Sequence, residues 1–187
     1  MDKQTSLSLI ADAMRTDNVT ENLRESATNL VPGDGNPDAE IVFIGEAPGA
    51  KEDLLGVPFV GAAGKFLATM LASISLSRED IYITNIVKYR PPKNRDPTPA
   101  EITASIPYLM RQLDVIEPKI IVLLGRHAMN VFFPELKISE AHGVPVEQDG
   151  RTYLPLYHPA AALYNPGLRQ ALMNDFERIP AIIKQTS

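Results

Sequence analysis

The chain contains no cysteine among its 187 residues. This absence excludes disulfide bonds, cysteine nucleophiles, thiolate-ligated zinc and iron–sulfur clusters held by cysteine. The three histidines are scattered along the sequence, which argues against a histidine-rich metal site. We therefore expect neither a metal ion nor any other cofactor.

Membrane and secretion signals are also missing. No run of apolar residues is long enough to span a bilayer, and residues 1–10 lack the charged start and apolar segment of a signal peptide. We therefore expect a cytoplasmic protein with no membrane partner. The net charge of −5 argues against nucleic-acid binding over the whole surface, but it leaves room for a local basic strip.

The glycine-rich segments do not match the common nucleotide-binding patterns. No lysine stands in a glycine-rich phosphate loop, and no Gly-x-Gly-x-x-Gly follows the first expected strand. Nucleotide triphosphate hydrolysis and dinucleotide binding therefore lose support. No serine occupies a nucleophile elbow either.

Apolar, β-branched segments alternate with segments of helical periodicity along the chain. The expected strands are residues 39–44, 81–87, 119–125 and 152–157, and the expected helices are residues 65–75, 98–117, 126–133 and 165–179. Strands joined by right-handed helical crossovers form a parallel sheet covered on both faces. We predict an α/β fold, a three-layer α/β/α sandwich around a central, mainly parallel sheet of four strands.

A single core suffices for a chain of 187 residues that is 44% hydrophobic. We therefore expect one domain over residues 1–187, in which residues 1–30 form a helix and a loop laid on the rest. Thr98, Pro99 and Glu101 predict the start of a helix, because Thr98 can cap it, proline suits its first position and Glu101 can close a capping box.

The first expected strand ends in a tight turn at residues 45–53 that carries three carboxylates, Glu46, Glu52 and Asp53. Two glycines and a proline force this turn, and such a turn would let a ligand reach the backbone. A simpler interpretation, a strand-to-helix connection with solvated acids, remains open from these residues alone.

Ligands of parallel α/β folds bind at the carboxyl ends of the strands. This rule places Glu46, Asn85, Arg126 and His158 along one edge of the sheet. Phe59 belongs to an apolar loop beside that edge, and it is either a core residue or a stacking platform held over a pocket.

A basic strip follows the second expected strand. Residues 88–96 hold four cations and one acid, and the cations are Lys88, Arg90, Lys93 and Arg95. A solvated loop is the simpler interpretation, but prolines that keep the strip extended would suit a backbone that follows phosphates. An aromatic ring, an amide, a histidine and a carboxylate beside such a strip suit a base extruded from DNA. We expect no role for His127 or His142, which spacing does not tie to this edge.

Five segments together resemble the family 4 uracil-DNA glycosylases. They are Gly-Glu-Ala-Pro-Gly-x-x-Glu-Asp at 45–53, Pro-Phe-Val-Gly-x-Ala-Gly at 58–64, Thr-Asn-x-Val-Lys at 84–88, Asn-Arg-Asp-Pro-Thr-Pro at 94–99 and His-Pro-Ala at 158–160. The likeness runs in order from about Thr28 to Phe176. It implies a DNA-repair enzyme that flips uracil out of DNA and hydrolyses its N-glycosidic bond, which leaves an abasic site and free uracil.

The resemblance implies how the base and the DNA are bound. Phe59 would stack on the flipped base, Asn85 would read the uracil edge and reject cytosine, and Glu52 would crowd the position of a thymine methyl group. The residues that would contact the DNA strand are Lys88, Arg90, Lys93, Asn94 and Arg95.

The resemblance also implies the catalytic roles. Glu46 would help to place the attacking water, with less help than usual because Ala47 stands where other branches of the superfamily carry an aspartate. His158 would donate to O2 of the departing uracil. Leu163 or Tyr164 would wedge into the base stack, and the sequence does not choose between them.

One family feature is missing. The family holds a four-iron cluster with four cysteines, and the corresponding positions here are Asn18, Glu21, Tyr89 and Ser105. No cluster is therefore expected, and Tyr89 is a candidate to fill the vacated space. We expect an active monomer whose partner is uracil-containing DNA. The alternatives are a non-catalytic module that binds uracil or damaged DNA, a glycosylase with altered base specificity, and a small-molecule nucleoside hydrolase, which the basic strip disfavours.

Overall fold

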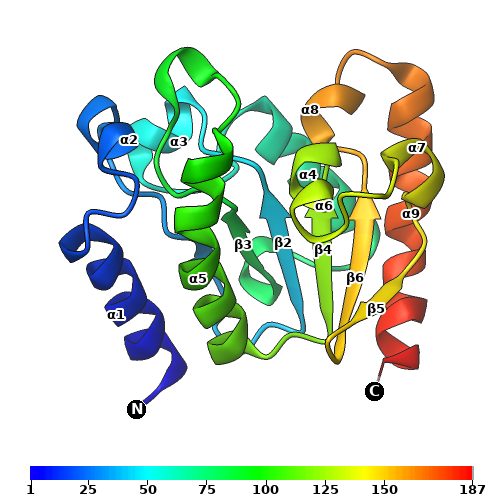
Figure 1. Ribbon diagram of the computed structural model, residues 1–187. Helices are drawn as coiled ribbons and strands as arrows, with labels where there is room; N and C mark the ends of the chain where they lie inside the picture. Colours follow the sequence, from blue (N-terminus) through cyan, green and yellow to red (C-terminus); the bar gives the residue numbers. More distant parts are fainter. Residues whose placement is uncertain (187) are drawn as a thin grey trace.

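The computed structural model describes residues 1–186. A six-stranded sheet in the order β1-β3-β2-β4-β6-β5 lies between two layers of helices (Figure 1). The strands are β1 (Asp34–Gly35), β2 (Ile41–Gly45), β3 (Tyr82–Asn85), β4 (Ile120–Leu124), β5 (Val146–Gln148) and β6 (Arg151–Leu156). The helices are α1 (Lys3–Thr16), α2 (Glu21–Ser26), α3 (Ala50–Leu55), α4 (Ala62–Ser73), α5 (Pro99–Ile116), α6 (Arg126–Phe132), α7 (Ile138–Ala141), α8 (Pro159–Ala162) and α9 (Pro166–Gln185), with 3₁₀ turns η1 (Arg78–Asp80) and η2 (Pro92–Asn94).

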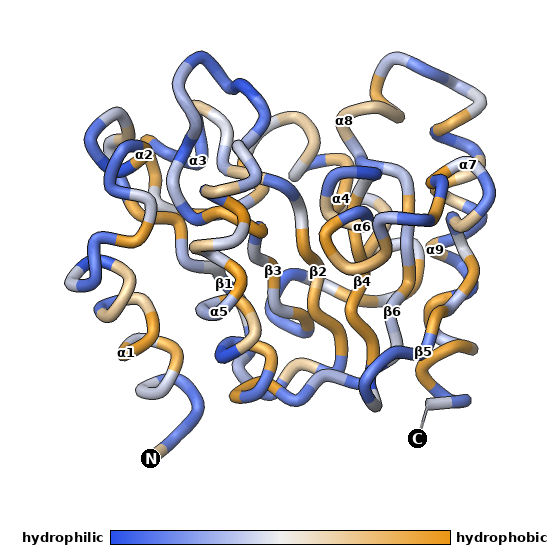
Figure 2. Tube along the Cα trace, in the orientation of Figure 1, coloured by the Kyte–Doolittle hydropathy of each residue, from blue (hydrophilic) through white to orange (hydrophobic). Residues whose placement is uncertain are grey.

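The sheet separates two hydrophobic cores. Successive side chains of a strand point to opposite faces, so Val42 and Ile44 of β2 pack with apolar residues of α1, α5 and α6. Ile41 and Phe43 pack on the other face with apolar residues of α4 and α9. Figure 2 shows apolar residues along β2 and β4 and hydrophilic residues in the loop that rises before α5. Burial on both faces is typical of parallel strands in α/β proteins.

The predicted three-layer sandwich is confirmed, but the sheet has six strands rather than four. The four predicted strands are present as β3, β2, β4 and β6, and they pair in parallel. The two additional strands, β1 and β5, are antiparallel edges of two and three residues. Segments this short carry too few alternating residues to be recognised from the sequence.

Helix α5 begins as the sequence predicts. Thr98 accepts a hydrogen bond from the Glu101 backbone N–H at 3.3 Å, and the Glu101 carboxylate accepts one from the Thr98 backbone N–H at 2.8 Å. The N-terminal helix α1 lies beside α5 and buries Leu7 and Met14 (Figure 1). Within residues 1–186, no helix is both long and apolar enough to cross a membrane.

The carboxyl ends of the parallel strands meet at one edge of the sheet. Gly45 at the end of β2 is paired with Asn85 at the end of β3, and Leu124 at the end of β4 is paired with Leu156 of β6. The segments that continue from these residues therefore lie close together. In Figure 1 the arrowheads point to this edge, above which α8 and the loop before α5 rise.

Candidate active site

A cavity of about 280 Å³ opens at the carboxyl edge of the sheet. Its lining residues are Ala47, Gly49, Glu52, Phe59, Gly61, Ala62, Ala63, Asn85 and His158. The sequence-predicted base-binding residues and the predicted donor thus line one cavity. They come from the end of β3 and from the segments that follow β2 and β6, so the rule for ligand sites in parallel α/β folds holds for this chain.

Asn85 is the buried polar group of this cavity. The residue is 2% exposed, and its side-chain amide forms no hydrogen bond within residues 1–186. No side-chain N or O atom of these residues is both fully buried and unpaired, so the Asn85 amide opens onto the cavity. An amide that opens onto a cavity and has no partner within the described residues is available to a ligand with complementary groups. A Cβ atom on Gly45 would lie 2.5 Å from Asn85 Oδ1 and 2.8 Å from Phe59 Cζ. Only glycine therefore lets β2 approach both side chains.

Phe59 is held in a constrained loop conformation. Its φ angle is +52°, a left-handed value that is rare for residues with a side chain. Arg78 fixes the loop by donating to the carbonyl oxygens of Pro58 and Phe59, each at 2.8 Å. The ring is 7% exposed, packs on the core beneath α4, and stacks on His158 with a centroid separation of 5.7 Å. The structure therefore joins the two sequence interpretations, because Phe59 is a core residue whose ring also lines the cavity.

Glu52 supports the same loop from below. Its Oε1 atom accepts hydrogen bonds from the backbone N–H groups of Val60 and Gly61, each at 3.1 Å. Glu52 also lines the cavity. The carboxylate therefore fixes the turn that follows Phe59, a task that the sequence motif did not indicate.

His158 is the N-cap of α8, and its hydrogen bonding determines which ring nitrogen carries the proton. Nδ1 accepts a hydrogen bond from the Ala160 backbone N–H at 3.0 Å. Burial, with a smaller contribution from nearby His127, lowers the pKa of His158 to about 4. At neutral pH the ring is therefore uncharged and its proton resides on Nε2, which leaves an N–H donor for a ligand.

Glu46 contacts a histidine for which the sequence predicted no role. His127 Nδ1 lies 3.0 Å from Glu46 Oε2, and His127 Nε2 lies 3.7 Å from Asp96 Oδ2. Burial raises the pKa of Glu46, and the charge of His127 acts in the opposite direction. His127 follows β4 by three positions, so the rule that placed Arg126 at the sheet edge could also have placed His127 there.

A second cavity of about 520 Å³ adjoins the first. Glu46, His127 and His158 line it together with apolar residues that include Tyr157 and Leu168. Ala47 and His158 line both cavities. The His158 side chain therefore separates the larger cavity, which Glu46 lines, from the smaller cavity, which Asn85 lines. A carboxylate and a neutral N–H donor therefore line one cavity.

The basic strip is only partly exposed. Lys88 is fully buried, and its Nζ atom donates to Thr84 Oγ1, to Asn85 O at 2.7 Å and to Gln112 Oε1 at 2.7 Å. Burial lowers the pKa of Lys88, whereas three oxygen acceptors match the three N–H groups of an ammonium ion. The expectation that Lys88 contacts DNA is therefore wrong. Lys88 instead anchors the backbone of Asn85.

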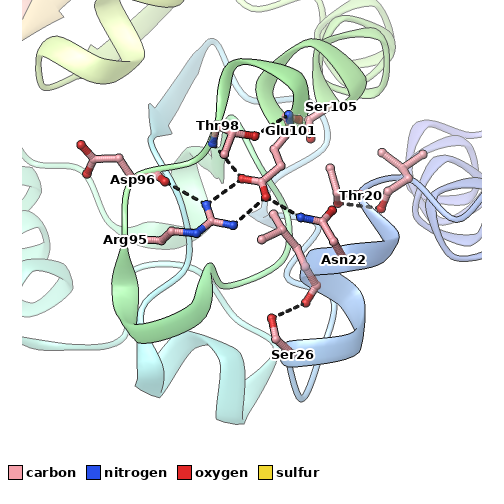
Figure 3. A network of polar contacts seen from close by, with 10 residues as sticks. Thr20, Asn22, Ser26, Arg95, Asp96, Thr98, Glu101 and Ser105 are labelled. Atoms are coloured by element: carbon pink, nitrogen blue, oxygen red, sulfur yellow. Dashed lines mark hydrogen bonds and ion pairs between the residues drawn. The ribbon is translucent and has the colours of Figure 1, made fainter.

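The remaining residues of the strip lie in the loop around η2. Arg90 is half-buried and donates to Asn94 Oδ1 at 2.7 Å, while Lys93 and Asn94 are exposed. Arg95 makes two hydrogen bonds to the Glu101 carboxylate, at 2.7 and 2.9 Å (Figure 3). The charge of Arg95 is therefore shared with an internal partner, whereas Lys93 is free to meet a phosphate.

The two wedge candidates also differ in exposure. Tyr164 is 90% exposed, whereas Leu163 is partly buried against the core beneath α4 and α9. A side chain that enters a base stack must be accessible, so the structure favours Tyr164.

His142 Nδ1 lies 2.7 Å from Asp175 Oδ2, and neither residue lines the two cavities described above.

Comparison with known proteins places this site in a family. The family model described as the uracil DNA glycosylase superfamily matches residues 32–178. The chain belongs to the uracil DNA glycosylase superfamily. A type-4 uracil-DNA glycosylase from Archaeoglobus fulgidus is 54% identical over 166 residues, which cover 84% of this chain and 83% of the relative. A protein of the same name from Sulfurisphaera tokodaii is 52% identical over 81% of this chain and 74% of the relative. Another, from Thermotoga maritima, is 42% identical over 87% of this chain and 88% of the relative.

This superfamily member cannot hold the four-cysteine cluster that the family 4 resemblance implies. Asn18 accepts a hydrogen bond from Arg24, Tyr89 is 4% exposed within the core beneath α1 and α5, and Ser105 donates to Glu101 O at 2.8 Å. The fourth position, Glu21, is exposed in the first turn of α2. These side chains offer no thiolate, and those of Asn18 and Ser105 already have other partners. The residues therefore do not fit a cluster.

Glu46, Asp96 and His127 are the metal-ligand types that come together in this glycosylase-superfamily site. One ligand atom from each lies within 4.8 Å of the others. Two of these atoms, His127 Nδ1 and Glu46 Oε2, are already at hydrogen-bond distance from one another. A histidine between two carboxylates accounts for this geometry without a cation.

Proposed function

We propose that this chain is a type-4 uracil-DNA glycosylase that works without an iron–sulfur cluster. It flips uracil out of DNA and hydrolyses the N-glycosidic bond, which leaves an abasic site. The observation that carries the proposal is that the Asn85 amide, which forms no hydrogen bond within residues 1–186, lines one cavity with His158, whose neutral ring has an Nε2–H donor. The names of relatives that are 42–54% identical over most of the chain support the same activity.

Base recognition follows from the groups in the smaller cavity. The Asn85 carbonyl would accept from uracil N3–H, and its NH₂ group would donate to O4. Cytosine presents the opposite pattern at these two positions, so the same amide rejects it. The face of Phe59 would stack on the base, a contact worth roughly 1–3 kcal/mol. Glu52 holds the turn after Phe59 and would crowd a methyl group at C5.

Bond cleavage requires stabilisation of the departing base. The C1′–N1 bond breaks with its electron pair moving to uracil, and negative charge grows on O2. His158 would donate its Nε2–H to that oxygen, which is worth about 3–4 kcal/mol for a preorganised donor to a developing anion. A water molecule placed by Glu46 would form the new C1′–O bond and pass its proton to the carboxylate.

We assign the DNA contacts to the exposed part of the loop around η2 and to the segment after α8. Lys93, Asn94 and Arg90 would meet phosphates, and Arg95 would contribute the part of its charge that Glu101 leaves uncompensated. Tyr164 would enter the base stack and keep the gap open. The monomeric state, free uracil as the product and a cytoplasmic location stay predictions.

The test is excision from labelled oligonucleotides that carry uracil opposite guanine, uracil opposite adenine and uracil in a single strand. Alkali converts each abasic site into a strand break. We expect cleavage that survives a chelator and collapses in His158→Ala. Tight binding to uracil-containing DNA without cleavage would instead establish the binding-module alternative. Cleavage of free deoxyuridine that resists added salt would favour a nucleoside hydrolase, because loss of phosphate contacts makes only DNA cleavage salt-dependent.

Asn85→Asp tests base recognition. An aspartate can accept from the cytosine N4 amino group but cannot donate to uracil O4. We expect weaker uracil excision and some cleavage of cytosine. Unchanged uracil excision in this variant would show that Asn85 does not read the base.

A further inference from the structure

His127 occupies a position between two carboxylates at the catalytic edge. Its Nδ1 atom lies 3.0 Å from Glu46 Oε2, and its Nε2 atom lies 3.7 Å from Asp96 Oδ2. The three groups come from separate elements: Glu46 from the turn after β2, Asp96 from the loop before α5, and His127 from α6. Side-chain exposure rises from 24% at Glu46 to 42% at His127 and 68% at Asp96. The contact therefore connects a partly buried acid to the surface loop.

The hydrogen bonding of His127 indicates the direction of the Glu46 contact. Arg126 Nε lies 3.4 Å from His127 Nε2 and donates to it. With Nε2 as an acceptor, the proton of the neutral ring resides on Nδ1 and is donated to Glu46 Oε2. One oxygen of the Glu46 carboxylate is thereby engaged, and the other is left for a water molecule.

Glu46 has no second carboxylate beside it in the chain, because the next residue is Ala47. The charged and titratable groups that affect it come from two other elements: Asp96 from the loop before α5, and Arg126 and His127 from α6. His158, before α8, lines the same cavity as Glu46 and His127. Of these groups, His127 is the one that donates directly to the carboxylate.

We propose that His127 is a positioning residue for Glu46, which it holds in the orientation and the ionised state that water placement requires. Asp96 faces the far nitrogen of the same ring, with its Oδ2 atom 3.7 Å from Nε2. The inference rests on the proposed role of Glu46 and adds a residue to it. His127 itself is not assigned a contact with uracil or with the reacting atoms.

The test compares His127→Ala with His127→Asn. The Asn side chain places an N–H donor close to where Nδ1–H stood, but it cannot titrate. Single-turnover excision of uracil from a single-stranded oligonucleotide is measured as a function of pH and of enzyme concentration. We expect His127→Ala to lower the maximal rate constant about 10- to 100-fold, the effect of losing a hydrogen bond to a charged group, with half-saturation unchanged. His127→Asn should restore most of the rate.

The pH profile adds a readout that a purely structural role would not change. His127 opposes the effect of burial on the pKa of Glu46. Removing the imidazole should raise that pKa further, so the rate should begin to fall at a higher pH on acidification, in both His127→Ala and His127→Asn. An acid limb that stays in place in both variants would overturn the assignment.

Glu46→Gln and the double variant Glu46→Gln/His127→Ala separate this inference from the proposed function. If His127 acts through Glu46, the double variant should match Glu46→Gln within about twofold, the usual error of additivity. If the fold-losses of the two single variants multiply in the double variant, His127 acts independently of Glu46. If His127→Ala changes only the enzyme concentration at half-saturation, His127 contacts DNA. Either outcome overturns the inference. Full activity of Glu46→Gln would overturn the role of Glu46 itself. Asn130→Ala, one turn along α6, is the control for helix integrity, and thermal unfolding is followed for every variant.

Discussion

Glu101 connects α2, near positions where the family would carry its cluster ligands, to the loop around η2. Its carboxylate, whose side chain is 4% exposed, accepts two hydrogen bonds from Arg95 and one each from the Thr98 backbone at 2.8 Å and from Asn22 Nδ2 at 2.6 Å (Figure 3). Asn22 belongs to α2 and Arg95 to the loop around η2. Replacing the charge at position 101 should therefore loosen both segments at once.

The size of the effect follows from the pKa of this carboxyl group. The hydrogen bonds from Arg95 are the largest cause that lowers the pKa of Glu101 from 4.5 to about 2. That difference corresponds to about 3 kcal/mol of preference for the ionised form in the folded state. Because the side chain of Arg95 is 39% exposed, solvent screening reduces the figure, and we expect about 2 kcal/mol at neutral pH.

The sign of the pH dependence is determined by the lowered pKa. The ionised form of Glu101 stabilises the fold fully above its unfolded-state pKa, and the contribution is lost as the pH falls from 4.5 towards 2. Glu101→Gln has no such titration. The free energy of unfolding of Glu101→Gln should therefore lie about 2 kcal/mol below that of the parent at pH 7. The two proteins should converge as the solution is acidified.

Urea unfolding at neutral pH and at several values below 4.5 measures this difference. Glu25→Gln is the matched control, because Glu25 is an exposed acid of α2 outside the network. The control should unfold within about 0.5 kcal/mol of the parent, as surface substitutions do. A loss in Glu101→Gln that is no larger than in the control at pH 7, or that does not shrink on acidification, would refute the reasoning.

Three further predictions concern the site itself. In Gly45→Ala a Cβ atom would lie 2.5 Å from Asn85 Oδ1. We therefore expect this variant to lose uracil excision and about 1–3 kcal/mol of stability by overpacking, which excision assays and urea unfolding measure. Tyr164→Ala should weaken excision from duplex DNA much more than from single strands and should leave Tm unchanged, because Tyr164 is exposed. Leu163→Ala should instead lower Tm, because Leu163 packs on the core. The reverse pattern would make Leu163 the wedge. The pKa of His158 is about 4, so its neutral Nε2–H donor persists above that pH. The rate of base release should therefore not fall between about pH 6 and 9. A tenfold fall for each pH unit would mean that the charged ring is required.

The fold and the base cavity could be predicted because their signals are local. Buried strands such as residues 41–45 and 120–124 are continuous apolar runs, and the helix start at Thr98 is a short pattern of capping residues. Once the strands are placed, the carboxyl-edge rule brings Asn85 and His158 together without any knowledge of side-chain contacts.

The errors concern residues whose surroundings come from distant parts of the chain. Lys88 reads as the first residue of a basic surface strip, but its amino group meets Gln112 of α5 and Thr84 of β3 inside the protein. His127 reads as an ordinary helix residue until the loop that carries Asp96 folds over α6. No local pattern distinguishes such residues from exposed ones, because Gln112 lies 24 positions from Lys88, and Asp96 lies 31 positions from His127.

Without cluster ligands, the loop around η2 is held by a different kind of interaction. Thiolate–iron bonds would tie the loop and α5 to the N-terminal segment, whereas here Glu101 joins α2 and Arg95 by hydrogen bonds that require an ionised carboxylate. Asp96 is the next residue after Arg95, and its backbone oxygen also accepts from the Arg95 side chain at 3.0 Å. Loss of the Glu101 charge would therefore free Asp96, which faces His127. Because His127 contacts Glu46, we expect the position of Glu46 to change as well. One series of charged contacts thus connects Glu101 to Glu46, and we expect the position of the loop and the proposed placement of Glu46 to weaken together as acid protonates Glu101.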